Sequence, residues 1–115
     1  MSCVFCKILK GEIPSEKLYE DEDMFIIRDI DPKAEKHYLM IPKRHYKLIA
    51  DMTKEDGLAF QRAIRKIPTL TENLGLQSGY RLVINQGDDA GQTVFHLHVH
   101  ILAGQPLDFP DLRKK

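Results

Sequence analysis

The segment Phe95–Leu102 constrains the fold and the chemistry of this chain more than any other. It reads FHLHVHIL, so that three histidines alternate with leucine, valine and isoleucine. A period of two is typical of a β-strand with one apolar face, and the opposite face then carries His96, His98 and His100. Packing rarely requires three imidazoles on one face, so a functional surface is the better interpretation. The alternatives are a metal cluster and a catalytic site that uses imidazole near its unperturbed pKa of ~6.5.

A polar segment with two glycines, Asn85–Thr93, comes directly before the histidines. Gly91 allows the backbone to approach a ligand closely, and the consecutive N–H groups after it can form an anion nest. A loop glycine by itself more often marks a turn. Beside three histidines, however, this loop indicates a phosphate-binding site.

The composition is that of one globular domain with balanced charge. The chain has 115 residues, and 43% of them are hydrophobic, which is enough for a core. Lys plus Arg and Asp plus Glu number 17 each, so nothing in the charge favours a nucleic-acid polymer or an anionic membrane as partner. The sequence shows neither a run of about 18 apolar residues nor a signal-peptide region. We therefore expect a single domain over residues 1–115, located in the cytoplasm.

Local patterns predict an α+β fold with an antiparallel sheet. Helical spacing of apolar residues predicts a short helix over Cys3–Leu9. The expected strands are Leu18–Glu20, Met24–Arg28, His37–Ile41, Arg81–Asn85 and Phe95–Leu102. Strands that meet mainly in hairpins, in the order β-β-β-α-β-β, favour an α+β class.

A longer helix is predicted in the middle of the chain. Thr53 begins a sequence typical of a capping box, and Gly75 is the natural C-cap. Pro68 interrupts the pattern and should kink the helix or split it in two. One apolar stripe at helical period comprises Phe60, Ala63, Ile64, Ile67, Leu70 and Leu74.

Cys3 and Cys6 form a Cys-x-x-Cys pair with three possible interpretations. A redox pair requires a strand before it, and only two residues precede Cys3. Half of a zinc site requires two further ligands, for which imidazoles are available. The third interpretation is two inert thiols near a frayed terminus.

The histidine segment matches the His-φ-His-φ-His-φ-φ motif of the histidine triad (HIT) superfamily, and the chain resembles that family over nearly its whole length. The further matching segments are Cys3–Ile8 with Ile13-Pro14, Arg28–Pro32, Ile41–His45 and Asn85–His100. Ile101–Gly104 resembles the ending of the Hint branch, the histidine triad nucleotide-binding proteins. The resemblance implies a HIT-like fold: a five-stranded antiparallel sheet with one longer and one short helix. It also implies a two-fold dimer with a ten-stranded sheet.

The resemblance also implies an activity, which is the hydrolysis of purine nucleoside 5′-phosphoramidates (AMP- or GMP-linked amines) to the 5′-monophosphate. His98 would attack the α-phosphorus and form a covalent nucleotidyl-His98, which water then hydrolyses. His100 would bind the phosphate oxygens, with help from Asn85 and the backbone of Gly91–Thr93. Thr93 stands where the family often has serine, and its hydroxyl would help to protonate the leaving amine.

The nucleoside pocket implied by the resemblance is built mainly from the N-terminal half of the chain. Asp29 matches the carboxylate that holds the ribose hydroxyls, and Gln92 belongs to the phosphate loop. Ile27 stands where animal relatives have an aromatic residue. The residues matching the wall around the base are Phe5, Ile8, Ile13, Ile27, Arg28 and Ile30. Judged without the resemblance, Phe5, Ile8 and Ile13 read as core.

Zinc is the cofactor that the resemblance implies. The ligands would be Cys3, Cys6, His45 and His96, a closed four-ligand set that is structural and takes no part in catalysis. The fifth histidine, His37, is interpreted as structural.

Three other functions remain open at this point. A dinucleoside polyphosphate hydrolase on the same fold is disfavoured by Ala103-Gly104, because that branch usually has Pro-Arg there. A non-catalytic nucleotide-binding or scaffold protein would bind AMP without forming an adduct at His98. A metal-dependent enzyme would use the three alternating histidines as ligands and would lose activity to a chelator.

Overall fold

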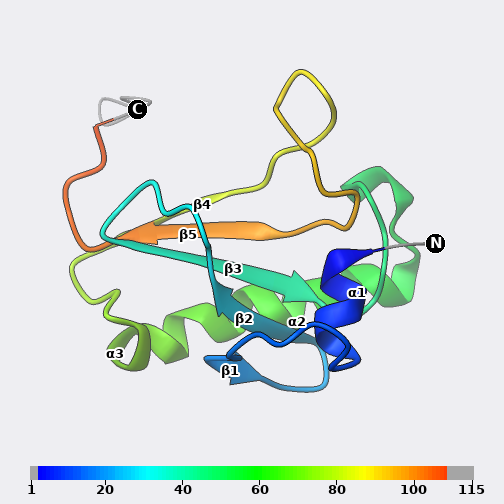
Figure 1. The fold of residues 1–115 in the computed structure, drawn as a ribbon, viewed down its shortest axis with the longest axis horizontal. Coiled ribbons are helices and arrows are strands. Elements are labelled where there is room, and N and C mark those ends of the chain that lie inside the picture. The colour runs from blue at the N-terminus through cyan, green and yellow to red at the C-terminus, as the bar shows by residue number, and fades with distance from the viewer. Residues whose placement is uncertain (1–2, 109–115) are drawn as a thin grey trace.

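A five-stranded antiparallel sheet in the order β1-β2-β3-β5-β4 forms the centre of the molecule, seen in a computed structural model that describes residues 3–108 (Figure 1). The strands are β1 (Tyr19–Glu20), β2 (Met24–Arg28), β3 (Lys36–Pro42), β4 (Tyr80–Val83) and β5 (Val99–Ala103). The helices are α1 (Val4–Leu9), α2 (Lys54–Lys66) and α3 (Thr71–Leu74), with 3-10 turns η1 (Ile49–Asp51) and η2 (Ile67–Leu70). The α+β class and the antiparallel sheet are confirmed.

The two faces of the sheet carry different layers. Alternation along β2 sends Met24 and Ile26 into one core and Phe25 and Ile27 into another. The first and larger core lies under α2, η2 and α3, and it includes Ala63, Ile67, Leu70 and Leu74 of the predicted apolar stripe, with Phe60 and Ile64 packed against it. The second core lies under α1, which sits at one end of the opposite face (Figure 1). His100 and Asp29 lie on this second face, beside the smaller core.

The helical region in the middle of the chain begins, breaks and ends where the sequence predicts. Thr53 caps α2, because its hydroxyl accepts from the Asp56 N–H at 3.1 Å and the Asp56 carboxylate accepts from the Thr53 N–H at 3.0 Å. Pro68 lies in the 3-10 turn η2, which separates α2 from α3. Gly75 closes α3 at φ 71°, a left-handed conformation that favours glycine. The predicted split and both caps are confirmed.

The expected strand over Phe95–Leu102 is wrong at its start, because β5 begins only at Val99. Residues before Val99 bend away from the sheet, and the Leu97 N–H donates instead to the Tyr46 carbonyl at 2.8 Å. Two of the three alternating histidines therefore precede the strand and only His100 lies on it. The neighbouring strand β4 is also displaced from the expected Arg81–Asn85, and it ends at Val83, opposite His100.

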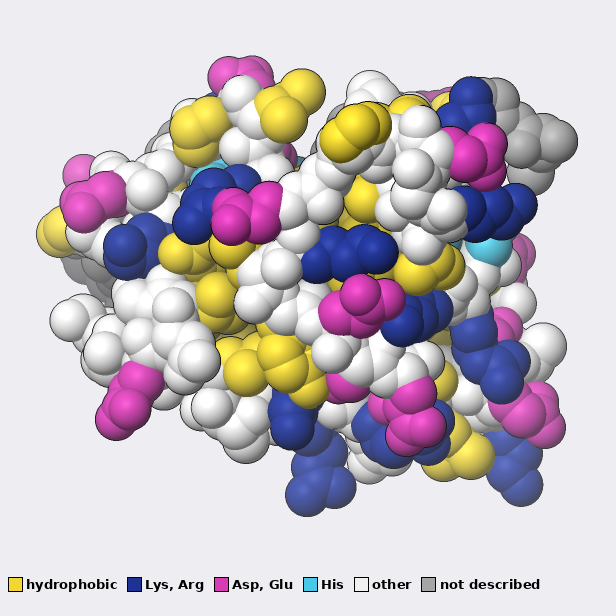
Figure 2. All heavy atoms as spheres, turned by 60° about the horizontal axis from the view of Figure 1, so that its bottom comes forward, with side chains coloured by type: hydrophobic (Ala, Val, Ile, Leu, Met, Phe, Trp, Pro, Cys, Tyr) yellow, Lys and Arg dark blue, Asp and Glu magenta, His cyan; other side chains and the backbone are white. Residues whose placement is uncertain are grey.

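Several charged side chains form ion pairs on the surface. On the face drawn in Figure 2, Lys and Arg side chains lie beside Asp and Glu side chains, with hydrophobic side chains between them. Examples are the ion pairs Lys43–Glu20 at 2.8 Å and Arg62–Asp23 at 2.9 Å. Within residues 3–108, no helix is both long enough and apolar enough to cross a membrane.

Candidate active site and metal centre

A cavity of about 550 Å³ opens on the α1 face of the sheet, within the usual size range of small-ligand pockets. Twelve of the residues expected to bind nucleotide line it: Phe5, Ile8, Ile13, Ile27, Arg28, Asp29, Ile30, Asn85, Gly91, Thr93, His98 and His100. Val4, Pro14, Ser15, Leu39 and Val94 also line it and were not anticipated. The cavity therefore brings together residues from both halves of the chain.

The wall of the cavity combines buried core with exposed rim. Phe5, Ile8 and Ile27 are at most 7% exposed and belong to the second core, so the core interpretation of Phe5 and Ile8 is confirmed, and all three also line the cavity. Ile30, by contrast, is fully exposed at the rim, and Arg28 forms an ion pair with Glu16 there. An apolar floor and a rim that carries charged side chains suit a ligand with a flat apolar part and a charged part.

Gln92 does not line the cavity, although the sequence placed it in the phosphate loop. Its side chain is 4% exposed and accepts from the Gly87 N–H at 2.9 Å. Its amide group donates to the Lys47 carbonyl at 3.0 Å and faces the Val94 carbonyl at 3.3 Å. The Gln92 side chain therefore holds the loop in shape, so that the neighbouring Gly91 and Thr93 can border the cavity.

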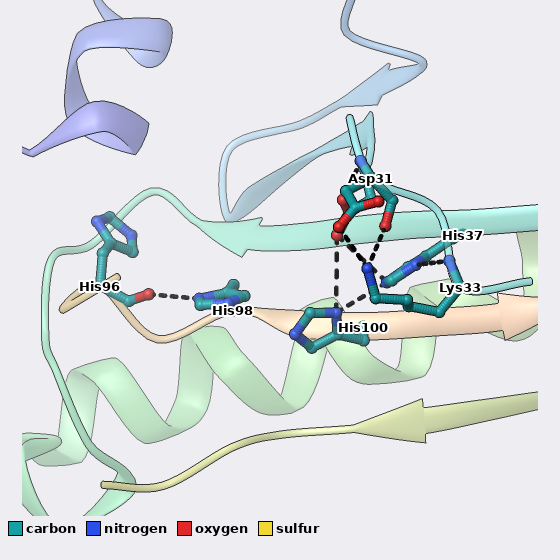
Figure 3. A network of polar contacts seen from close by, with 7 residues as sticks. Asp31, Lys33, His37, His96, His98 and His100 are labelled. Carbon is teal, nitrogen blue, oxygen red and sulfur yellow. Dashed lines mark hydrogen bonds and ion pairs between the residues drawn. The ribbon is translucent and has the colours of Figure 1, made fainter. Parts of the chain in front are cut away.

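His98 presents one ring nitrogen to the cavity with a free lone pair. Its Nδ1 lies 2.8 Å from the carbonyl oxygen of His96 (Figure 3). A carbonyl can only accept, so Nδ1 carries the proton of the neutral ring and Nε2 keeps its lone pair. The ring also packs against the edge of Phe5, with the centroids 5.1 Å apart. A neutral imidazole held in this way is suited to nucleophilic attack.

His100 belongs to a polar group that the motif alone does not predict. His37 Nε2 lies 2.9 Å from His100 Nδ1 and 3.3 Å from a carboxylate oxygen of Asp29. The other carboxylate oxygen of Asp29 accepts from the Asp31 N–H at 2.8 Å. Figure 3 shows His37, His100, Asp31 and Lys33 gathered at one end of the histidine segment. Burial and the neighbouring His98 and His37 lower the pKa of His100 to about 4, and burial also lowers that of His37.

His37 reaches this group because of the strand register. Leu39 pairs with His100 and His37 with Leu102, so that His37 and His100 are diagonal neighbours on one face of the sheet. The backbone ladder continues past β2, because the Asp29 N–H donates to the His37 carbonyl at 2.9 Å. The sequence did indicate that His37, Leu39 and Ile41 share one face of the sheet, because side chains alternate along a strand. That β5 pairs with β3 and brings His100 to the same face could not be read from the sequence.

The four expected metal ligands converge at the other end of the segment. Cys3, Cys6, His45 and His96 each offer one ligand atom, and these atoms lie within 4.8 Å of one another. The separations are 3.4 Å from Cys3 Sγ to His96 Nδ1, 3.2 Å from Cys6 Sγ to His45 Nδ1 and 3.0 Å between the two Nδ1 atoms. Ligand atoms around a tetrahedral zinc ion lie roughly 3.3–3.8 Å apart. The donor set suits Zn²⁺, and two of the three separations lie a few tenths of an ångström below this range, so small side-chain shifts would let the four residues hold the ion.

The protonation of this cluster also suits a cation. His96 is 1% exposed, and its Nε2 donates to the Pro42 carbonyl at 2.7 Å, which leaves the Nδ1 lone pair for a metal. Burial lowers the pKa of His96 to about 4, so the ring is neutral at pH 7. Burial and the Cys3 thiol raise the pKa of Cys6 to about 11. A raised pKa means that the thiolate is disfavoured, and a bound divalent cation would stabilise it.

Comparison with known proteins agrees with this geometry. A model of the HIT domain family matches residues 10–107. The structure is similar to that of a HIT family hydrolase from Legionella pneumophila Philadelphia 1, with a TM-score of 0.87 and 39% sequence identity over 95% of this chain and 98% of that chain.

Two further solved structures are similar to this chain. One is a histidine triad nucleotide-binding protein from Candida albicans, with a TM-score of 0.77, 34% identity, and coverage of 98% of this chain and 89% of that chain. The other is a Zn-bound histidine triad family protein from Mycobacterium smegmatis, with a TM-score of 0.78, 37% identity, and coverage of 98% of this chain and 82% of that chain.

Proposed function

The chain belongs to the HIT domain family and has the fold of HIT family hydrolases, and from this premise we propose that it is a purine nucleoside phosphoramidase. The reaction is hydrolysis of the phosphorus–nitrogen bond of an AMP- or GMP-linked amine. The observation that carries the proposal is the bond from His98 Nδ1 to the His96 carbonyl, 2.8 Å long, beside a cavity with an apolar floor. It leaves the Nε2 lone pair available to a phosphorus atom.

The reaction proceeds in two displacements. His98 Nε2 attacks the α-phosphorus, the phosphorus–nitrogen bond breaks, and the leaving nitrogen takes a proton to depart as an amine. The exposed hydroxyl of Thr93, at the cavity, is the proposed source of that proton. Water then attacks the phosphorus of nucleotidyl-His98 and gives a proton back to the Thr93 oxygen, and the phosphorus–imidazole bond breaks to release the 5′-monophosphate and the free imidazole. The sum is one phosphoramidate and one water giving one nucleotide and one amine.

The remaining cavity residues bind and orient the nucleotide. Asp29 accepts hydrogen bonds from the ribose hydroxyls, since its carboxylate borders the cavity. His100 and Asn85 contact the phosphate oxygens together with the backbone at Gly91 and Thr93. The apolar residues Phe5, Ile8, Ile13, Ile27 and Ile30, with Arg28, surround the base. The Candida albicans neighbour, a nucleotide-binding protein, supports a nucleotide as the ligand.

Zinc has a structural role in this proposal. Cys3, Cys6, His45 and His96 would hold it, and when bound it neutralises the thiolates and joins α1 to the histidine segment. Four protein ligands leave no open position for a substrate. The Zn-bound Mycobacterium smegmatis neighbour supports zinc as the metal, and the donor set of this chain supports its place.

We also propose that the protein forms a homodimer. β4 is an edge strand, and its Leu82 is 37% exposed, while Leu58 on α2 is 48% exposed. An uncovered edge with apolar side chains is suited to pairing with a second copy. Sedimentation at micromolar concentration measures the mass directly. The cytoplasmic location expected from the sequence stays a prediction.

The test is AMP release from adenosine 5′-phosphoramidate by the purified protein in excess EDTA. We expect release, and we expect intact-mass analysis of samples quenched with denaturant at alkaline pH, where a histidine–phosphorus bond survives, to find an adenylyl adduct. The His98→Ala protein is the matched control and should give neither. AMP binding without release or adduct would identify a non-catalytic binding protein. Release that requires added Zn²⁺ would identify a metal-dependent enzyme.

The same assay with diadenosine polyphosphates separates the two hydrolase branches. Faster cleavage of the dinucleotide than of the phosphoramidate would replace the phosphoramidase by the dinucleoside polyphosphate hydrolase. We expect the phosphoramidate to be preferred.

A further inference from the structure

His37 is a buried histidine beside the active site that the proposed reaction does not use. It is 7% exposed, lies on β3 and contacts His100 of the motif. Burying an imidazole costs free energy unless both ring nitrogens have hydrogen-bond partners. The direction of each hydrogen bond then shows which nitrogen carries the proton. Those directions can be worked out from one donor whose role is fixed.

That donor is the backbone N–H of Lys33, in the turn after β2. It lies 3.0 Å from His37 Nδ1. A backbone N–H can only donate, so Nδ1 must accept and the proton of the neutral His37 ring is on Nε2. The tautomer of His37 is thus set by the chain itself.

The proton on His37 Nε2 in turn sets the state of His100. Nε2 faces His100 Nδ1 at 2.9 Å and the more distant Asp29 oxygen at 3.3 Å, and both must act as acceptors. His100 Nδ1 therefore carries a lone pair, and the proton of the neutral ring is on Nε2. We propose that His37 is a positioning residue that locks His100 in the Nε2–H tautomer, so that His100 offers an N–H donor to the phosphate of the substrate.

This arrangement makes His98 and His100 opposite tautomers, two residues apart. His98 has its proton on Nδ1 and a lone pair on Nε2, as a nucleophile needs. His100 has the reverse, as a donor to phosphate oxygens needs. The low pKa of His100, about 4, and the lowered pKa of His37 keep both rings neutral at pH 7, where the choice of tautomer matters.

The same geometry argues against a second metal site. Asp29, His37 and His100 have ligand atoms within 4.8 Å of one another, as a two-histidine, one-carboxylate site would. A metal at this place needs the lone pair of His37 Nε2. The Lys33 N–H prevents that, because a neutral ring that accepts at Nδ1 has its proton at Nε2.

The role of His100 in phosphate binding rests on the proposed function, whereas the tautomer is measurable without any substrate. Long-range proton–nitrogen NMR at pH 7 on the zinc-loaded, full-length protein distinguishes the two tautomers, and a His100→Asn protein assigns the signals. We expect His100 to be Nε2–H in the wild type and a mixture of tautomers in His37→Leu. A wild-type His100 in the Nδ1–H form would overturn the proposal, whatever the activity.

The kinetic arm uses a conservative variant as rescue. His37→Leu should lower kcat for the phosphoramidate roughly tenfold to a hundredfold, the range for losing a hydrogen bond to a charged group. His37→Gln should restore much of it, because the Gln amide N–H can reach the position of His37 Nε2 and donate to His100. Unchanged turnover in His37→Leu, or equal loss in both variants, contradicts the proposal. Disappearance of the His37 Nε2–H signal on adding a second equivalent of Zn²⁺ would identify a metal site instead.

If the wild type hydrolyses no phosphoramidate, the proposed function fails and the NMR result still decides the tautomer.

Discussion

The histidine segment holds the same side chain in two different ways. His96 is 1% exposed, binds the Pro42 carbonyl through Nε2 and turns Nδ1 toward two cysteines and His45. His98 is half-buried, binds a carbonyl through Nδ1 and turns Nε2 toward the cavity. The difference lies in which ring nitrogen a backbone carbonyl engages. A histidine's role therefore depends on its second hydrogen bond as much as on its place in a motif.

The two ends also differ in how they are closed. The proposed metal end gathers four potential ligand residues, while the proposed catalytic end opens into a cavity of about 550 Å³. Phe5 separates them, since its ring packs edge-on against both His96, at 5.8 Å between centroids, and His98, at 5.1 Å. We therefore expect the two ends to fail independently when each is altered.

The largest expected effect is at the catalytic end. His98→Ala should lower AMP release by at least about a thousandfold, ~4 kcal/mol of barrier, because it removes the nucleophile. The zinc content and the melting temperature should change little, because His98 faces the cavity and not the metal ligands. Single-turnover kinetics and metal analysis measure both. A variant that keeps most of its activity would contradict the nucleophile assignment.

Cys3→Ser is the corresponding change at the metal end. It should release zinc and lower the free energy of unfolding by a few kcal/mol, less than in small domains that depend on zinc for their core. Amide hydrogen exchange should speed up mainly in residues 3–10, while most of the AMP release remains. Complete inactivation of a folded Cys3→Ser protein would mean that the two ends are not independent and that the metal takes part in chemistry.

Acid should weaken the fold through the catalytic end even when zinc is absent. The pKa of His100 is lowered from 6.5 to about 4 in the folded protein, mainly by burial. Between these values the unfolded chain binds a proton that the folded protein does not, so stability falls as the pH drops from 6.5 to 4. In urea titrations with EDTA, the free energy of unfolding of His100→Gln should fall by roughly 3 kcal/mol less than that of wild type over this pH range. Equal losses would show that His100 is not buried as described.

The smallest expected effect is at the N-cap of α2, and it serves as a control for general destabilisation. Thr53→Ala removes the N-cap of α2, which packs on the opposite face of the sheet, and should cost ~1 kcal/mol of stability. AMP release at 25 °C and zinc content should both equal those of wild type. If Thr53→Ala lowered activity as much as a cavity variant, general destabilisation would explain both effects.

Much of this structure followed from local sequence patterns. The capped helix, its interruption at Pro68, the strand Met24–Arg28 and the left-handed Gly75 were all predicted, because each depends on residues adjacent in the chain. The cavity residues and the metal ligands came from the family motif, and the structure brings them together apart from the Gln92 side chain. The start of β5 was not predicted, because the bend before Val99 depends on a bond to the distant Tyr46 carbonyl.

By itself, the sequence determined the alternation of imidazole and apolar side chains, and with it the division of β5 between a core face and a functional face. Only the tertiary structure decided the proton positions on those imidazoles. They depend on the carbonyls of Pro42 and His96 and on the Lys33 N–H, groups that every residue type carries and that no motif records. Backbone donors and acceptors act through their place in space, and that place exists only once the strands have paired.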